Sequence, residues 1–128
     1  MKKVLIDTHV LLWWLADHTS LGKESRKIIS DERNDVFVSA VSAWEISIKK
    51  NKGLLKAPDN IDAIVEDEGF AKLPISLFHG EQAGKLKNIH RDPFDRMLIA
   101  QAQAEGLELM TADKTIPKYG LKIIDARL

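Results

Sequence analysis

The sequence predicts a three-layer α/β/α protein, in which helices cover both faces of a central parallel sheet. Short apolar runs alternate along the chain with longer helical stretches, as in strands joined by helical crossovers. The first run, Val4-Leu5-Ile6, is apolar throughout, as expected for a strand covered on both faces. The 128 residues fit one domain, so we expect residues 1–128 to form a single unit.

The order of the elements follows from hydrophobic periodicity and turn residues. The run Leu73-Pro74-Ile75 is placed at an edge of the sheet, because Pro74 has no N–H for a central ladder. Gly80 and Gly84 count against a helix over 77–86, although the pattern favours one. The other expected strands are 4–6, 35–39, 107–110 and 122–124, and the other expected helices are 8–15, 22–32, 42–52, 61–68 and 93–105.

Two of the helices have clear end signals. Ser42 and Glu45 form an S-x-x-E capping box for the helix 42–52, and Gly53 ends it. Asp92 and Pro93 suit the N-cap and the first position of the last helix. This helix ends at Gly106, and one of its faces carries Phe94, Met97, Leu98 and Gln101.

The composition excludes several classes of protein. A net charge of zero argues against a basic protein that packages DNA, although not against an enzyme that binds RNA locally. The absence of cysteine excludes disulfides and thiolate metal sites, and fits a reducing compartment. The apolar stretch from Val10 to Ala16 is too short to span a membrane, and Asp7 interrupts any signal peptide. We therefore expect a cytoplasmic protein.

Four acidic residues are placed where a ligand site of an open α/β sheet is expected, beyond the carboxyl ends of the strands. Asp7 and Asp113 follow predicted strands, and Glu45 and Asp95 lie in the first turns of helices. Carboxylates brought close together repel one another, and a divalent cation such as Mg²⁺ or Mn²⁺ removes that penalty. The pattern therefore favours a metal site that activates water at a phosphodiester.

Each acid also has a purely local explanation. Asp7 and Asp113 suit turns, Glu45 completes the predicted capping box, and Asp95 complements a helix dipole. We assign Asp92 only to the N-cap, and we set aside Asp125 because it lies close to the end of the sequence.

Other functional motifs are absent. Neither G-x-x-x-x-G-K nor G-x-G-x-x-G occurs, and there is no G-x-S-x-G motif. His79 and His90 are too far apart for a helical zinc motif, so we interpret them as surface residues or neighbours of ligands. The tryptophans, interpreted as core or interface residues, are Trp13, Trp14 and Trp44. The lysines interpreted as a solvated face are Lys49, Lys50, Lys52 and Lys56.

Taken in order, four segments resemble the PIN-domain ribonucleases. The strongest match is His90-Arg91-Asp92-Pro93-Phe94-Asp95-Arg96-Met97-Leu98-Ile99-Ala100-Gln101-Ala102. The others are Ile6-Asp7-Thr8-His9-Val10-Leu11-Leu12-Trp13, Ser39-Ala40-Val41-Ser42-Ala43-Trp44-Glu45-Ile46 and Met110-Thr111-Ala112-Asp113. Their spacing extends over nearly the whole chain, and the group most similar to this sequence is that of the VapC-type toxins.

This resemblance implies a metal-dependent endoribonuclease, the toxin of a toxin–antitoxin pair. Its catalytic residues and Mg²⁺ or Mn²⁺ ligands would be Asp7, Glu45, Asp95 and Asp113. A homodimer and a small antitoxin that covers the site are implied as well. The weaker candidates for contacts with the RNA substrate are Thr111, Lys49, Arg91 and Arg96.

Two other functions remain open at this point. A receiver-like phosphoacceptor domain would also bind a metal beside an aspartate, but it needs an acidic pair after the first strand, where Asp7 stands alone. An inactive module that binds RNA or protein is the second alternative, and the presence of all four acids argues against it.

Overall fold

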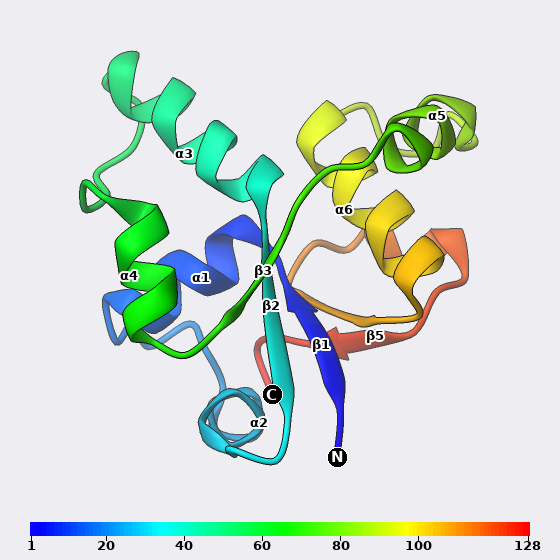
Figure 1. Cartoon of the computed structure of the whole chain (residues 1–128). Coiled ribbons are helices and arrows are strands. Elements are labelled where there is room, and N and C mark those ends of the chain that lie inside the picture. The colour runs from blue at the N-terminus through cyan, green and yellow to red at the C-terminus, as the bar shows by residue number, and fades with distance from the viewer.

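The computed structural model describes residues 1–128 and has a five-stranded sheet in the order β3-β2-β1-β4-β5, with every pair parallel (Figure 1). The strands are β1 (Lys3–Ile6), β2 (Asp35–Ser39), β3 (Ala71–Leu73), β4 (Glu108–Thr111) and β5 (Ile123–Asp125). The helices are α1 (Thr8–Leu15), α2 (Lys23–Ser30), α3 (Ala40–Asn51), α4 (Ile61–Asp67), α5 (Leu77–Lys85) and α6 (Pro93–Glu105), with a 3₁₀ turn η1 (Ile116–Tyr119). The predicted three-layer fold is confirmed.

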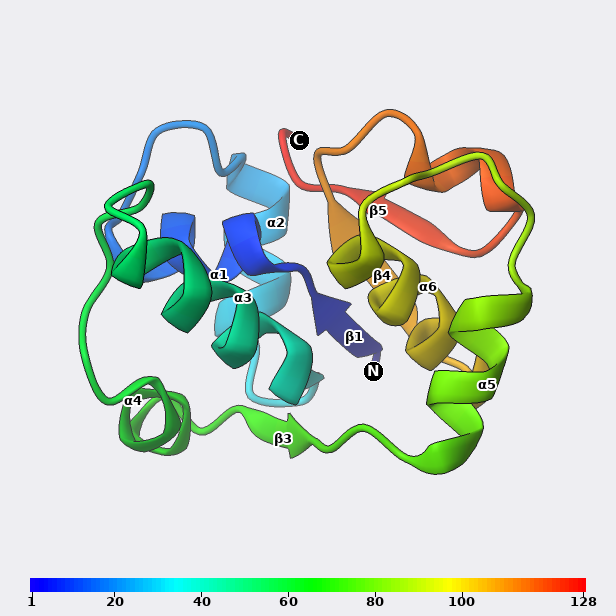
Figure 2. The ribbon, with the colours of Figure 1, turned by 90° about the horizontal axis from the view of Figure 1, so that it is seen from above.

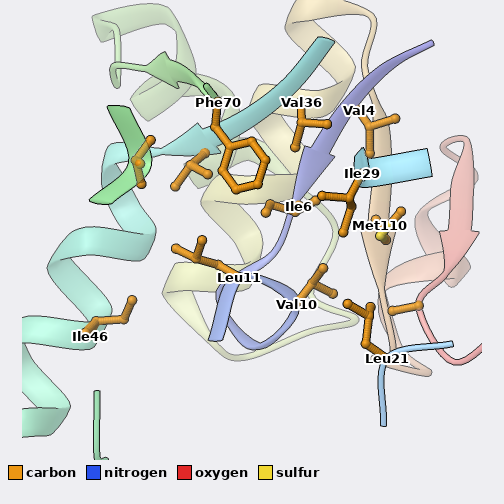
Figure 3. Close-up of a cluster of buried hydrophobic side chains, with 13 residues drawn as sticks. Val4, Ile6, Val10, Leu11, Leu21, Ile29, Val36, Ile46, Phe70 and Met110 are labelled. Atoms are coloured by element: carbon orange, nitrogen blue, oxygen red, sulfur yellow. The ribbon is translucent and has the colours of Figure 1, made fainter. Parts of the chain in front are cut away.

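The central strand β1 faces two separate cores. Val4 and Ile6 point into one cluster, and Leu5 points into the other. Helices α1, α2 and α4 cover the first face, and α6 covers the second, with α5 packed on the outside of α6 (Figure 2). In the first cluster Leu11 and Ile29 pack beside Phe70 and Met110 (Figure 3). Burial on both sides explains why the sequence of β1 is apolar throughout.

The last predicted helix is confirmed at both ends. The Asp92 carboxylate accepts the N–H of Phe94 at 2.8 Å, and Pro93 is the first residue of α6. The helix ends at Gly106, whose φ of 67° lies in the left-handed region that glycine adopts without strain. No helix in the structure is long and apolar enough to cross a membrane.

The predicted capping box of α3 is wrong. The helix starts at Ala40, and its N-cap is Ser39, whose hydroxyl accepts the N–H of Val41 at 3.0 Å. Ser42 lies inside the helix, where it is buried and accepts a hydrogen bond from the hydroxyl of Thr8 at 2.9 Å. Because β2 runs directly into α3, the last strand residue caps the helix and Glu45 has no capping role.

The other differences are small and lie at the edges of the sheet. The strand β3 is an edge strand as predicted, but it ends at Leu73, so Pro74 lies just beyond it. The helix α5 forms despite its two glycines, because Ser76 and His79 cap each other at its start. The 3₁₀ turn η1 was not predicted.

The Ser39 cap leads to a stability prediction. Ser39→Ala should lower the free energy of unfolding by about 2 kcal/mol, because it removes the N-cap and a hydrogen bond to the buried Gln101. Urea unfolding measures the change. Ser30→Ala, in an exposed position at the end of α2, should change the free energy of unfolding by less than about 0.5 kcal/mol. Equal effects of the two substitutions would contradict the assignment of the cap.

Candidate metal centre

The structure brings the four predicted acids to the same edge of the sheet. Asp7 directly follows β1 and caps α1, and Asp113 lies two residues beyond β4. Asp95 lies in the first turn of α6 as predicted, whereas Glu45 lies in the second turn of α3 and not in the first, because this helix already starts at Ala40. The carboxyl ends of β1 and β4 are adjacent because these strands pair in parallel. The convergence expected from the strand ends is therefore present in the fold.

Asp7 is both a helix cap and a buried acid. Only 5% of the residue is exposed, and its Oδ1 accepts the N–H of Val10 at 2.8 Å. Burial raises the pKa of Asp7 and the charge of Glu45 adds to this effect, while hydrogen bonds from Thr111 and Val10 oppose it. The local explanation of Asp7 as a turn residue is thus correct, but it leaves a buried carboxyl group at the centre of the cluster.

His90 joins two of the acids. Its Nε2 lies 3.0 Å from an oxygen of Asp95 and 3.1 Å from an oxygen of Asp113. Its Nδ1 accepts the backbone N–H of Asp92 at 3.2 Å, so in the neutral ring Nε2 carries the proton and donates it to Asp113, with Asp95 close by. Of the two interpretations of His90 from the sequence, that of a surface residue is wrong, since its side chain is only 14% exposed, and the ring lies beside two of the predicted acids.

The two carboxyl groups that His90 joins have opposite pKa shifts. Burial raises the pKa of Asp95 to about 7, with further increases from the charges of Asp92, Asp7 and Asp113. Burial also acts on Asp113, but hydrogen bonds from the N–H groups of Ile116 and Thr115, and from His90, outweigh it and lower the pKa of Asp113. The centre therefore resists holding all its negative charges at once.

Glu45 has a buried carboxylate oxygen that no group in the cluster binds. The residue is only 3% exposed, and one of its oxygens, Oε2, pairs with the Lys49 ammonium. The other oxygen, Oε1, is buried and has no hydrogen-bond partner. A buried carboxylate oxygen without a partner carries a penalty of roughly 1–3 kcal/mol, which a cation would remove. The oxygen-rich set of side chains fits a hard divalent ion such as Mg²⁺ or Mn²⁺.

A further measure of the fit is how closely the side chains approach each other. Ligand atoms of His90, Asp95 and Asp113 all lie within 4.8 Å of one another. Because Nε2 of His90 carries a proton that it donates to Asp113, it offers no lone pair to a metal ion, and the two acids are the members of this group that could hold one.

The weaker candidates from the sequence separate into two groups. Thr111 is buried beside Asp7 and accepts the N–H of Asp113, and Lys49 is bound to Glu45, so both lie in the centre. Arg91 is exposed next to His90. Arg96 is held apart, because its guanidinium group donates to main-chain carbonyl oxygens. These belong to Ala83, Leu86, Lys87 and His90.

Other residues that were singled out from the sequence lie away from the centre. The interpretation of His79 as a surface residue is wrong, since it is 3% exposed and binds Glu105 at 2.8 Å. Its partner lies 26 residues further along the chain, so no local pattern reveals the burial. Trp13 and Trp14 pack against the first core cluster, whereas Trp44 is 60% exposed.

The raised pKa of Asp95 leads to a stability prediction. The folded form holds a proton up to a pH of about 7 and the unfolded form only up to about 3.8, so folding stability falls as the pH rises between these values. Asp95→Asn removes this loss. In the metal-free protein, this substitution should therefore raise the free energy of unfolding. The increase should be larger at about pH 8 than at about pH 5, by on the order of 1–2 kcal/mol.

Urea unfolding with EDTA present at the two pH values provides the measurement. Asp35→Asn is the matched control, because Asp35 is exposed at the opposite, amino end of β2. A variant at position 95 that is destabilised equally at both pH values would disprove the strained state of this acid.

The comparisons with known proteins agree with this fold. The sequence model of the PIN domain family matches residues 4–122. Ribonuclease VapC16 of Mycobacterium tuberculosis is 37% identical over 62 residues, which are 47% of this chain and 44% of that protein. The aligned part thus spans less than half of the relative.

Solved structures extend the similarity over the whole chain. A DNA-bound VapBC from Salmonella typhimurium has a TM-score of 0.72 at 19% identity and covers 98% of each chain. A toxin–antitoxin complex from Klebsiella pneumoniae has a TM-score of 0.68 at 17% identity and covers 96% of this chain and 97% of the other. These structures share the fold, and the resemblance to VapC proteins is confirmed. The family match over residues 4–122 shows that the chain belongs to the PIN domain family.

Proposed function

We propose that this protein is a metal-dependent endoribonuclease that hydrolyses phosphodiester bonds of RNA. The observation that carries the proposal is the buried Glu45 Oε1 without a partner, in a cluster with Asp7, Asp95 and Asp113. A site of carboxylates without a nucleophilic side chain suits hydrolysis assisted by a metal ion. The relative that is named a ribonuclease supports RNA as the substrate.

Each acid has an assigned role. Asp7, Asp95 and Asp113 would hold Mg²⁺ or Mn²⁺, and Glu45 would hold a second ion or orient the attacking water. The bound ion would lower the pKa of a water molecule and offset the negative charge that develops on the phosphodiester. His90 keeps Asp113 in place through a hydrogen bond, and its Nε2 also lies 3.0 Å from Asp95.

Lys49 has a dual position in this proposal. Its ammonium group donates a hydrogen bond to Glu45, which raises the pKa of Lys49; partial burial opposes this increase, and the charges of Glu45, Asp92 and Asp95 add to it. It therefore stays protonated and can hold Glu45 in place or contact a phosphate of the substrate. Arg91 and Thr111 remain proposed contacts, whereas the main-chain bonds of Arg96 assign it to the fold.

We also propose that the chain is the toxin of a toxin–antitoxin pair and acts in the cytoplasm. Two of the structures with the same fold are described as a toxin–antitoxin complex and as a VapBC. A small antitoxin protein that covers the acids would keep the enzyme inactive. The gene beside this one is the place to look for such a partner.

A cleavage experiment tests the proposed activity. Purified protein, freed of partners by refolding, is incubated with mixed cellular RNA and Mg²⁺, Mn²⁺ or EDTA. Cleavage should depend on the metal, and Asp95→Asn should lower the rate at least about a hundredfold because a ligand is lost. Asp35→Asn should cut at the wild-type rate. Metal binding without any RNA cleavage would instead favour an inactive binding module.

We propose a homodimer formed through exposed apolar side chains on α3, α5 and the chain before α5. On α3, Trp44 is 60% exposed. On α5, Leu77 is 91% and Phe78 55% exposed, and Ile75, just before α5, is 40% exposed. Trp44 also lines a hollow of about 300 Å³ together with Phe94, against which it packs edge to face at 5.3 Å. A group of exposed apolar residues of this kind is typical of an interface, and a second copy is the occupant we assign.

Light scattering during gel filtration tests the dimer. Leu77→Glu should raise the dimer dissociation constant at least about tenfold, because it places a charge in an apolar interface. Leu54→Glu is the matched control, since Leu54 is 71% exposed on another part of the surface and should leave the dimer intact. A wild-type monomer, or equal effects of both substitutions, would rule out this interface.

A further inference from the structure

A hollow of about 270 Å³ lies beside the acids, at the carboxyl ends of β4 and β5. Asp113 forms part of its wall, so the hollow begins at the metal centre. Its lining also includes Thr111, Lys114, Pro117, Asp125 and Arg127. It is therefore placed to receive a group that is covalently linked to whatever binds at the acids.

The hollow contains two cations without acidic partners. Neither Lys114 nor Arg127 takes part in an ion pair. Most acidic residues of the protein pair with other basic residues instead. The Asp125 carboxylate accepts the backbone N–H of Arg127 at 2.9 Å instead of its guanidinium group. The oxygens of Asp113 are bound by His90 and by main-chain N–H groups. Both cations are thus free of direct ion pairs, although the carboxylates of Asp113 and Asp125 line the same hollow.

The main chain holds Arg127 in a fixed position. Its neighbour Ala126 is fully buried and donates its N–H to the carbonyl of Thr111 at 3.0 Å. On the other side, the carbonyl of Leu128 accepts the N–H of Ser25 at 2.8 Å. The guanidinium carbon lies 5.7 Å from the ring centroid of Trp13. These bonds fix the backbone on both sides of Arg127, so the backbone needs no further ordering when the side chain binds an anion.

We propose that Arg127, assisted by Lys114, binds a phosphate of the RNA strand adjacent to the phosphodiester held at the acids. This inference rests on the proposed nuclease function and adds the site for the neighbouring nucleotide. A guanidinium group matches the geometry of a phosphate and binds it through two N–H donors. Arg127 is then a positioning residue, which acts on the binding of the strand and not on the reacting atoms.

The test uses a reporter RNA that contains a site cut by the wild-type protein in cellular RNA. Initial rates with Mg²⁺ at several KCl concentrations give kcat and KM. Arg127→Gln should raise KM about tenfold and change kcat by less than about twofold, since one charged hydrogen-bonded contact is lost. The slope of log(kcat/KM) against log[KCl] should become shallower by about 0.7, the value for one phosphate contact on a single strand.

Two further variants separate binding from a structural role. Arg127→Lys should restore most of the salt dependence, because it keeps a positive charge that a phosphate can bind. Lys122→Gln removes the same charge from an exposed, unpaired residue just before β5, at the opposite, amino end of this strand, and should match the wild type. Loss of melting temperature without any change in the salt slope would assign Arg127 only to packing on Trp13 and overturn the inference.

The remaining outcomes distinguish this inference from the proposed function. If the wild type cuts RNA with Mg²⁺ and Arg127→Gln has the same KM and salt slope, the nuclease function stands and the phosphate site is wrong. A loss in kcat with an unchanged KM would also overturn it. If the wild type cuts no RNA, the proposed function and this site both fail.

Discussion

The parallel pairing of β1 with β4 is the constraint on which the centre depends. These strands align Val4 with Glu108 and Ile6 with Met110, and the N–H of Asp7 continues the ladder to the carbonyl of Met110 at 3.1 Å. This one register sets the place of Asp7 relative to Asp113. The helices α3 and α6 then bring their acids over the same edge, because each starts next to the sheet.

The arrangement of the acids lowers the stability of the folded protein. A buried carboxylate oxygen of Glu45 has no partner, and burial, together with the charges of nearby acids, raises the pKa of Asp95 to about 7. Such strain persists only where the surrounding structure is strong enough to impose it. Here the strength comes from two apolar clusters on opposite faces of the sheet, with β1 fully buried between them. A bound cation would relieve the strain and stabilise the folded state.

Features of the fold that depend on neighbouring residues could be predicted from the sequence, whereas features that depend on contacts between distant residues could not. The helix α6 was predicted to the residue because Asp92, Pro93 and Gly106 act within a few residues of its ends. The start of α3 was misplaced because Ser39 and Ser42 are both good caps, and only the burial of Ser42 against Thr8 decides between them.

The same division holds for the site. The positions of the acids at strand ends and helix starts predicted their convergence. The bridging role of His90 depends on the path of the chain between β4 and η1, and the unpaired oxygen of Glu45 depends on tertiary burial. Arg127 was missed altogether, because its proximity to Trp13 and Asp113 comes from a segment that folds back over α2.

The distribution of the acids along the chain also affects when activity can arise during synthesis. Asp7 emerges from the ribosome early, but its neighbouring strand β4 and the last acid, Asp113, emerge only after more than a hundred residues. Until then β1 has only one of its two partner strands, and the edge that gathers the acids does not exist. The incomplete chain therefore has no assembled site. The translating ribosome is not exposed to the activity of the proposed nuclease until nearly the whole domain has been made.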